Sequence, residues 1–177
     1  VNVVFGDRVI MLGALQNLDQ KTRANVLILD RMFTHEPAAL ALEDLQAIHE
    51  GTRALTLATS FWPAVRDSAA VVQRAADGQA PVYGVNTGFG KLASQRINAR
   101  DLATLQLNLI RSHSVGVGAP LAPSVVRLMI ALKAASLARG YSGVRPVVIE
   151  TLLAVYNAGL VPWVPCQGSV GASGDLA

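Results

Sequence analysis

The sequence predicts a mainly α-helical protein, and three observations support this prediction. Apolar residues recur at intervals of three and four along four long segments, a proline stands at the start of three of them, and a glycine follows the end of each. Hydrophobic residues make up 51% of the 177 residues, so the chain has enough apolar material to form a core. Disorder is therefore excluded as the overall state.

Five helices are expected between such start and stop signals. The expected spans are Leu42 to Glu50, Pro63 to Gly78, about Asp101 to just before Gly116, Pro123 to Gly140, and Pro146 to Gly159. Proline is favoured in the first turn of a helix, and glycine accepts the left-handed conformation that ends many helices, which we expect at Gly78. In the helix that follows Pro123, Val125, Leu128, Leu132 and Ala135 are expected on one side.

Two longer stretches, 79–95 and 161–177, are rich in glycine and are expected to be loops. Loops on a rigid scaffold commonly carry binding and catalytic residues, so functional residues are expected in these stretches. Residues 1–31 are interpreted as an extension whose status the sequence leaves open, because Val1 is not an initiator residue and Met32 offers an alternative start.

Charge and cysteine content exclude several classes of protein. Charged residues make up 15% of the chain, against about 25% in typical soluble domains, so we expect part of the surface to be covered by further sequence or another subunit. The net charge of +3 is spread over single basic residues, which argues against binding to nucleic acid or a membrane surface. The lone Cys166 cannot form an internal disulfide, and no secretory leader or membrane-spanning run is present, so we expect a cytoplasmic protein.

The glycine-rich loop near residue 177 lacks the common catalytic motifs. Neither Ser169 nor Ser173 lies in a Gly-x-Ser-x-Gly elbow, no lysine of a phosphate-binding loop follows, and the glycine spacing differs from the dinucleotide fingerprint. The three histidines and one cysteine are far apart in sequence, so we expect no metal site.

The run Ala172-Ser173-Gly174 permits a different chemistry because its side chains are small. The amide nitrogen of Gly174 can attack the Ala172 carbonyl only where the backbone turns tightly, and this closes a five-membered ring. Loss of the Ser173 hydroxyl as water then leaves an exocyclic methylene, which is a strong electrophile. An ordinary turn is the alternative for such a sequence.

Four motifs bear on this choice. They are Tyr-Gly-Val-Asn-Thr-Gly-Phe-Gly at 83–90, Ser-His at 112–113, Leu-Ala-Arg-Gly-Tyr-Ser-Gly-Val-Arg at 137–145, and Gly-Ser-Val-Gly-Ala-Ser-Gly-Asp-Leu-Ala at 168–177. In this order and spacing they resemble the aromatic amino-acid ammonia-lyases, over roughly residues 37–177. The resemblance implies an aspartase/fumarase-like helical bundle, a homotetramer, and chains of several hundred residues. Residues 32–177 then correspond to the N-terminal portion of the lyase domain, truncated just after Ala-Ser-Gly.

The same resemblance implies roles for individual residues. Ala172, Ser173 and Gly174 match the triplet that forms a methylidene-imidazolone, with no external cofactor. Tyr83 matches the base that removes the substrate's β-proton. Phenols have pKa values of about 10, so this role needs a site that lowers the pKa or removes the proton in concert. A surface tyrosine that only packs its ring is the alternative.

Three further residues are assigned to the substrate. His113 follows Leu109 by four residues on one helix face and matches a pocket position, although a structural buried histidine fits the pattern equally. Phenylalanine-specific members have Phe-Leu and many tyrosine-specific members His-Leu at positions 112 and 113, so the polar pair Ser112-His113 favours histidine. Asn86 is assigned to substrate binding, whereas capping of the backbone is the alternative role for Asn86 and Asp175.

The expected reaction is therefore elimination of ammonia from L-histidine to give urocanate by the full-length parent, with the fragment alone inactive. Two alternatives remain open. One is a tyrosine or phenylalanine ammonia-lyase or aminomutase, and the other is a truncated copy without catalytic activity.

Overall fold

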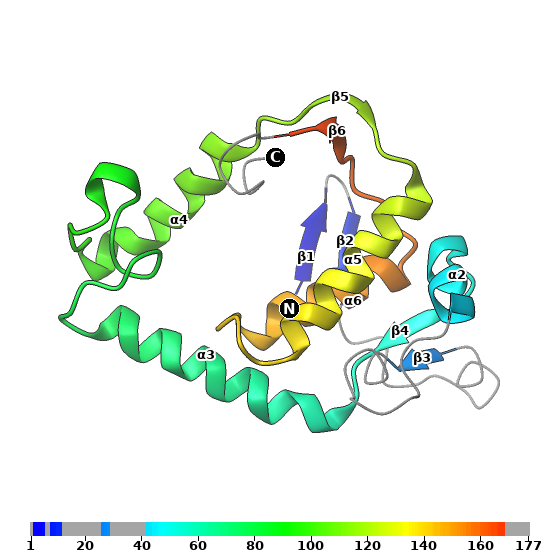
Figure 1. The fold of residues 1–177 in the computed structure, drawn as a ribbon, viewed down its shortest axis with the longest axis horizontal. Coiled ribbons are helices and arrows are strands. Elements are labelled where there is room, and N and C mark those ends of the chain that lie inside the picture. The colour runs from blue at the N-terminus through cyan, green and yellow to red at the C-terminus, as the bar shows by residue number, and fades with distance from the viewer. Residues whose placement is uncertain (1, 6–7, 12–25, 29–41, 169–177) are drawn as a thin grey trace.

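The computed structural model describes residues 2–5, 8–11, 26–28 and 42–168, and these residues are mainly helical (Figure 1). The α-helices are α2 (Leu42–Glu50), α3 (Trp62–Asp77), α4 (Ala99–His113), α5 (Pro123–Ala138) and α6 (Pro146–Asn157). Two short 3₁₀ turns, η3 (Thr59–Phe61) and η4 (Gly90–Leu92), precede α3 and α4. Each of the five expected helices is confirmed, with ends within about two residues of the expected ones.

Three small two-stranded sheets accompany the helices, and the sequence did not predict them. Strands β1 (Asn2–Phe5) and β2 (Arg8–Met11) form an antiparallel pair, and β3 (Val26–Ile28) pairs in parallel with β4 (Ala54–Thr56). Strands β5 (Val117–Pro120) and β6 (Pro165–Gln167) form the third, antiparallel pair. Strands of three or four residues carry too little alternation to be recognised before their partners are known.

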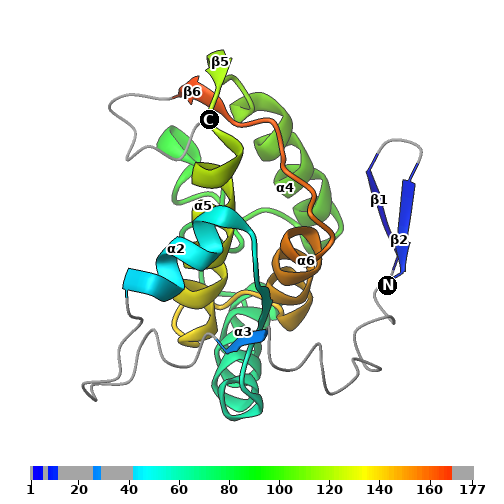
Figure 2. The same ribbon diagram turned by 90° about the vertical axis from the view of Figure 1, so that its right-hand side faces the viewer.

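The core lies where α2, α3 and α6 pack around α5, as Figure 2 shows for α2 and α6. Helix α5 contributes mostly small side chains to this contact, and Ala131, Ala134 and Ala135 are completely buried. Small residues at a helix contact allow close approach of the neighbouring backbones. Of the four residues expected on one side of α5, Ala135 is buried and Leu128 packs against the core, whereas Val125 and Leu132 are 39% and 47% exposed.

The ends of the helices follow the expected signals with one exception. Pro123 and Pro146 open α5 and α6, and Gly140 and Gly159 after their ends have left-handed φ values of 75° and 67°. Gly78 does not adopt the left-handed conformation, because its φ of −71° and ψ of 167° are extended. Side chains from the following loop bond the carbonyls at this end of α3 instead, as described below.

Polar side chains also tie the outer elements to α6. The amide of Asn157 accepts a hydrogen bond from the Leu55 N–H (2.7 Å) and donates one to the Leu55 carbonyl (2.8 Å), so it pairs with β4 as a neighbouring strand would. The Tyr156 hydroxyl donates to the Ile48 carbonyl at the end of α2 (3.2 Å). Burial raises the pKa of Tyr156, and the positive charge of Arg127 partly opposes this increase.

We expect Asn157→Ala to lower the free energy of unfolding by about 2–4 kcal/mol, because both backbone groups of the buried Leu55 lose their partner. Urea unfolding of the protein measures this loss. Asn108→Ala, the same change at an exposed position of α4, is the control and should alter stability by less than about 0.5 kcal/mol. Equal effects of the two substitutions would contradict the proposed contribution of the Asn157 amide.

Candidate active site

Tyr83 lies in a tight turn between α3 and α4, and its side chain is 65% exposed. Its ring packs edge to face against Phe89, with ring centroids 5.7 Å apart and an interplanar angle of 72°. Gly84 beside it has a φ of 75° and open space around it, so the glycine is needed for the backbone conformation rather than for room. The turn presents the tyrosine at the surface of the described chain, which suits either a catalytic role or simple packing.

Asn86 is completely buried and holds this turn together. Its Oδ1 accepts a hydrogen bond from the Val82 N–H (2.7 Å), and its Nδ2 donates to the carbonyls of Ala75 (2.9 Å) and Ala80 (3.0 Å). Both amide hydrogens are therefore used by the backbone. These contacts fit backbone capping, which the sequence offered as the alternative role of Asn86. The assignment of Asn86 to substrate binding stays a prediction.

Arg96 contributes a second contact to the same turn and was not selected from the sequence. Its guanidinium donates to the Gly78 carbonyl from Nη2 (3.1 Å) and Nε (3.3 Å), and its backbone forms an isolated bridge with the buried Thr87. Asn86 and Arg96 together satisfy carbonyls at the end of α3 that a left-handed Gly78 would otherwise cap. A lone arginine in a loop gives no signal of this role in the sequence.

Ser112 and His113 form a compact polar pair at the last turn of α4. The Nδ1 atom of His113 lies 2.8 Å from the Leu109 carbonyl oxygen and 2.8 Å from the Ser112 Oγ, and the Ser112 hydroxyl also donates to Leu109 (3.1 Å). A carbonyl oxygen can only accept, so Nδ1 must carry hydrogen. In the neutral ring, Nε2 is then left with a lone pair and acts as a hydrogen-bond acceptor.

The strand pair β5–β6 brings this polar pair close to the stem of the loop that contains Ala172, Ser173 and Gly174. The register aligns Val117 with Gln167, and β5 begins four residues after His113. Because the strands are antiparallel, the start of β5 lies beside the end of β6. His113, which precedes β5, is therefore on the same side of the strand pair as residue 168, which follows β6. The triplet itself lies outside the described residues, so its conformation is not described.

The structure does not bring Tyr83 to His113. The Ile97 N–H donates to the Asn86 carbonyl (2.8 Å), which places the tyrosine turn beside the start of α4, whereas His113 is the last residue of that helix. Figure 1 shows α4 between these two regions. Helix α4 has 15 residues, so at 1.5 Å per residue about 22 Å separates its ends.

The remaining motif, at residues 137–145, has a structural explanation. Gly140 and Gly143 both have left-handed φ values and lie against α3, where an added side chain would collide with Ala64 and Val72 respectively. The Gly143 N–H also donates to the Ser68 hydroxyl of α3 (2.9 Å). This motif therefore attaches the end of α5 to α3.

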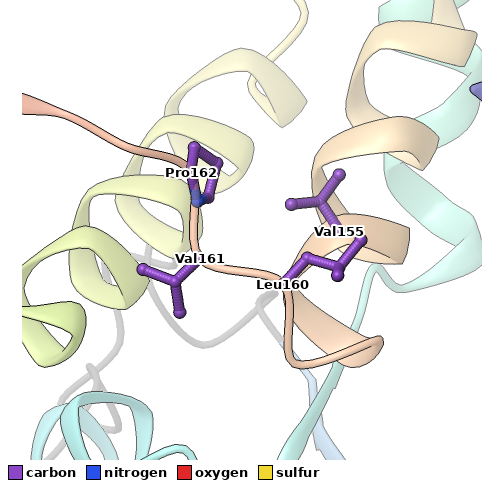
Figure 3. A pocket seen from close by; sticks show the side chains of 4 residues that line it. All are labelled: Val155, Leu160, Val161 and Pro162. Carbon is purple, nitrogen blue, oxygen red and sulfur yellow. The ribbon is translucent and has the colours of Figure 1, made fainter. Parts of the chain in front are cut away.

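Two pockets in the described chain do not offer a catalytic site. One is lined by the apolar residues Val155, Leu160, Val161 and Pro162, shown in Figure 3, and has no titratable group in its wall. In the other, Arg127 donates to the His49 carbonyl and Asn157 bonds to Leu55, so the main polar groups already have backbone partners. Within the described ranges, no three or more His, Cys, Asp or Glu side chains are grouped as metal ligands would be. No described helix is long and apolar enough to cross a bilayer.

The described chain is a helical scaffold whose motif-bearing turns lie at helix ends, and it is a member of a lyase family. The sequence profile described as aromatic amino acid lyase matches residues 40–177, and the chain belongs to this family. A histidine ammonia-lyase from Rhodospirillum rubrum is 52% identical over 141 residues, which cover 80% of this chain and 27% of that protein. The chain thus spans about a quarter of the length of the curated relatives it matches.

Solved structures agree with this fold. The histidine ammonia-lyase from Trypanosoma cruzi has a TM-score of 0.67 and 37% identity, over 77% of this chain and 26% of that chain. A tyrosine aminomutase from Streptomyces globisporus has a TM-score of 0.71 and 29% identity, over 81% of this chain and 26% of that chain. The expected helical lyase fold is therefore confirmed.

We expect Asn86→Ala to increase hydrogen exchange of the Val82 amide roughly tenfold, because the turn loses a buried hydrogen bond to that amide and two to neighbouring carbonyls. Exchange measured by mass spectrometry on peptides covering 79–97 tests this, with Asn108→Ala as a control. Unchanged exchange in Asn86→Ala would contradict the role of the amide in holding the turn.

Proposed function

We propose that this chain is part of an enzyme that eliminates ammonia from L-histidine to give urocanate. The observation that carries the proposal is the β5–β6 pair, because it joins the Ser112-His113 turn to the stem of the loop with Ala172, Ser173 and Gly174. Identity of 52% to the Rhodospirillum rubrum histidine ammonia-lyase supports histidine as the substrate.

We infer that Ala172, Ser173 and Gly174 form a methylidene-imidazolone, as the resemblance implies. The triplet fits this group chemically, because the Ser173 hydroxyl, the Gly174 amide and the Ala172 carbonyl supply every atom and no external cofactor is needed. When formed, the group supplies an electrophilic carbon that activates the amino acid toward loss of ammonia.

His113 is proposed to recognise the imidazole ring of the substrate. Its Nδ1 hydrogen is held by the Leu109 carbonyl and the Ser112 hydroxyl, so Nε2 is an acceptor in the neutral ring. An imidazole substrate has an N–H to donate to this atom, and the ring of phenylalanine has none. A site that loses a buried hydrogen-bond partner discriminates strongly against the ligand that lacks the group.

Tyr83 is proposed to accept the β-proton of the substrate on its phenolic oxygen, and Asn86 supports it by holding the turn on which it lies. Tyr83 and His113 lie at opposite ends of α4 in the described chain, so a site with both groups needs further chain or a second copy. We propose that assembly into a homotetramer completes the site. The exposed apolar residues Val125, Met129 and Leu132 on α5 support burial of this face in the complete protein.

We expect the enzyme in a reducing cytoplasm, in keeping with the single, exposed thiol of Cys166. Small amino acids are its expected partners, with no nucleic acid and no membrane involved. The 177-residue chain by itself is expected to be inactive.

The first prediction from this function concerns mass and turnover of the full-length gene product. Intact-mass spectrometry should find it lighter by two water molecules than its sequence, and Ser173→Ala should abolish this difference and the activity. Tyr83→Phe should keep the mass difference while turnover of histidine falls by about 10²–10⁴-fold, because a general base is lost. A full-length, folded protein with an unmodified mass and no release of ammonia would favour the copy without catalytic activity.

The second prediction concerns substrate choice. Replacing Ser112 and His113 by Phe and Leu should reduce kcat/KM for histidine by at least about 100-fold relative to phenylalanine, because the acceptor for the imidazole N–H is removed. Product analysis with histidine, tyrosine and phenylalanine in turn measures this ratio and also detects a β-amino acid, which an aminomutase would form. An unchanged preference would remove the basis for assigning these two residues to the substrate.

A further inference from the structure

Two glycines, Gly116 and Gly118, lie between the Ser112-His113 turn and the strand that leads to the Ala172–Gly174 loop. A Cβ atom at Gly116 would lie 2.9 Å from Cγ and 3.1 Å from Cβ of Pro165, and a Cβ atom at Gly118 would lie 2.8 Å from Cys166 Sγ. Carbon atoms that are not bonded to each other approach no closer than about 3.5 Å without repulsion. Neither position therefore has room for a side chain while β6 keeps its place.

The two positions differ in what a side chain would disturb. Gly118 has a φ of 91°, so a substitution there also strains the backbone, and its neighbour is a thiol that can rotate away. Gly116 has no such left-handed φ, and its neighbour is the ring of Pro165, which is closed onto its own backbone and cannot rotate. A side chain at Gly116 must therefore displace the backbone of β6.

Other contacts also hold β6, because Val164 just before it and Leu121 after β5 pack against the core. Its ladder with β5 aligns only Val117 with Gln167 and Pro120 with Pro165, and the register shifts between these pairs. The Leu121 N–H donates to the Val164 carbonyl beside it (2.8 Å). Pro165 is half-buried and Cys166 and Gln167 are exposed, so the strand has no fully buried side chain to anchor it. The close fit of β6 against Gly116 and Gly118 is thus one of the constraints on its position.

This strand is the last described segment before the triplet. Gln167 precedes Ala172 by five residues, which span at most about 18 Å when extended. Ring closure requires the Gly174 nitrogen to reach the Ala172 carbonyl carbon, so it takes place within seven residues of the end of β6.

We propose that Gly116 and Gly118 are positioning residues for cyclisation of Ala172, Ser173 and Gly174. Because they have no side chains, β6 can lie against them, and β6 is the last described strand before the triplet. The inference rests on the proposed function. In the step concerned, a bond forms between the Gly174 nitrogen and the Ala172 carbonyl carbon, and the carbonyl oxygen leaves as water with the amide hydrogens of Ser173 and Gly174. The Ser173 hydroxyl leaves with the Ser173 α-hydrogen as the second water, so no oxidant or other reactant is needed.

The test is the intact mass of the full-length protein carrying Gly116→Ala, with folding checked by circular dichroism and assembly by gel filtration. The variant should fold and assemble, yet most of its chains should keep the two water molecules that the unaltered protein loses. Adding Pro165→Ala removes the Cγ atom that causes the closest contact, and this double variant should regain the lighter mass in most chains.

Gly159→Ala is the control, because an added Cβ at Gly159 has no atom within 4 Å, so this substitution strains the backbone at its φ of 67° without causing a steric contact. It should lose both water molecules as the unaltered protein does.

The inference is overturned by a folded Gly116→Ala variant that cyclises completely. If Gly116→Ala does not fold, a folded double variant that stays unmodified overturns the inference equally. Absence of the mass loss from the unaltered full-length protein would instead contradict the proposed function, so the two failures are distinguishable.

Discussion

Backbone carbonyls at helix ends must find hydrogen-bond donors, and this constraint organises the described part of the chain. Arg127 donates to His49 at the end of α2, while Asn86 and Arg96 donate to Ala75 and Gly78 at the end of α3. Each donor lies in a different segment from the helix that it caps. The same bonds therefore also attach α5 to the end of α2 and the Tyr83 turn to the end of α3. The turn that bears Tyr83 owes its shape to this arrangement rather than to contacts of the tyrosine itself.

The motifs of the family divide into two classes. Some carry polar side chains that are assigned to the reaction, and others fix the conformation of the backbone. Ser112 and His113 form a polar group whose proton arrangement is set by the Leu109 carbonyl within the same helix. Gly140 and Gly143 contribute no functional group and allow contact with α3. Asn86 belongs to the second class by its contacts, although it lies three residues from Tyr83. Nearness in sequence to Tyr83, the proposed base, thus does not prevent a polar side chain from being used entirely by the backbone.

Local sequence signals predicted the helices well, but they did not predict the contacts between segments that are far apart in sequence. The prolines at 123 and 146 and the glycines at 140 and 159 act on neighbouring backbone, so the ends of α5 and α6 followed from the sequence. The buried face of α5 followed only in part, because apolar residues are spread widely around this helix and its core contact uses mainly alanines rather than the larger Val125 and Leu132. The short ladder of β5 and β6 joins segments about fifty residues apart. The sequence therefore selected Ser112 and His113 by resemblance, but it did not predict that β5 brings them near the end of β6.

The two apolar sides of helix α5 differ in when during synthesis they can become buried. Its alanine side belongs to a core whose members all lie between Ile48 and Tyr156, so that core is complete once these residues have left the ribosome. Its outer side, with Val125, Met129 and Leu132, stays exposed at that stage. In a protein as long as its relatives, roughly three quarters of the chain would still be untranslated. At a synthesis rate of about 5–20 residues per second, this exposed apolar surface remains accessible to chaperones and to other nascent chains for on the order of tens of seconds.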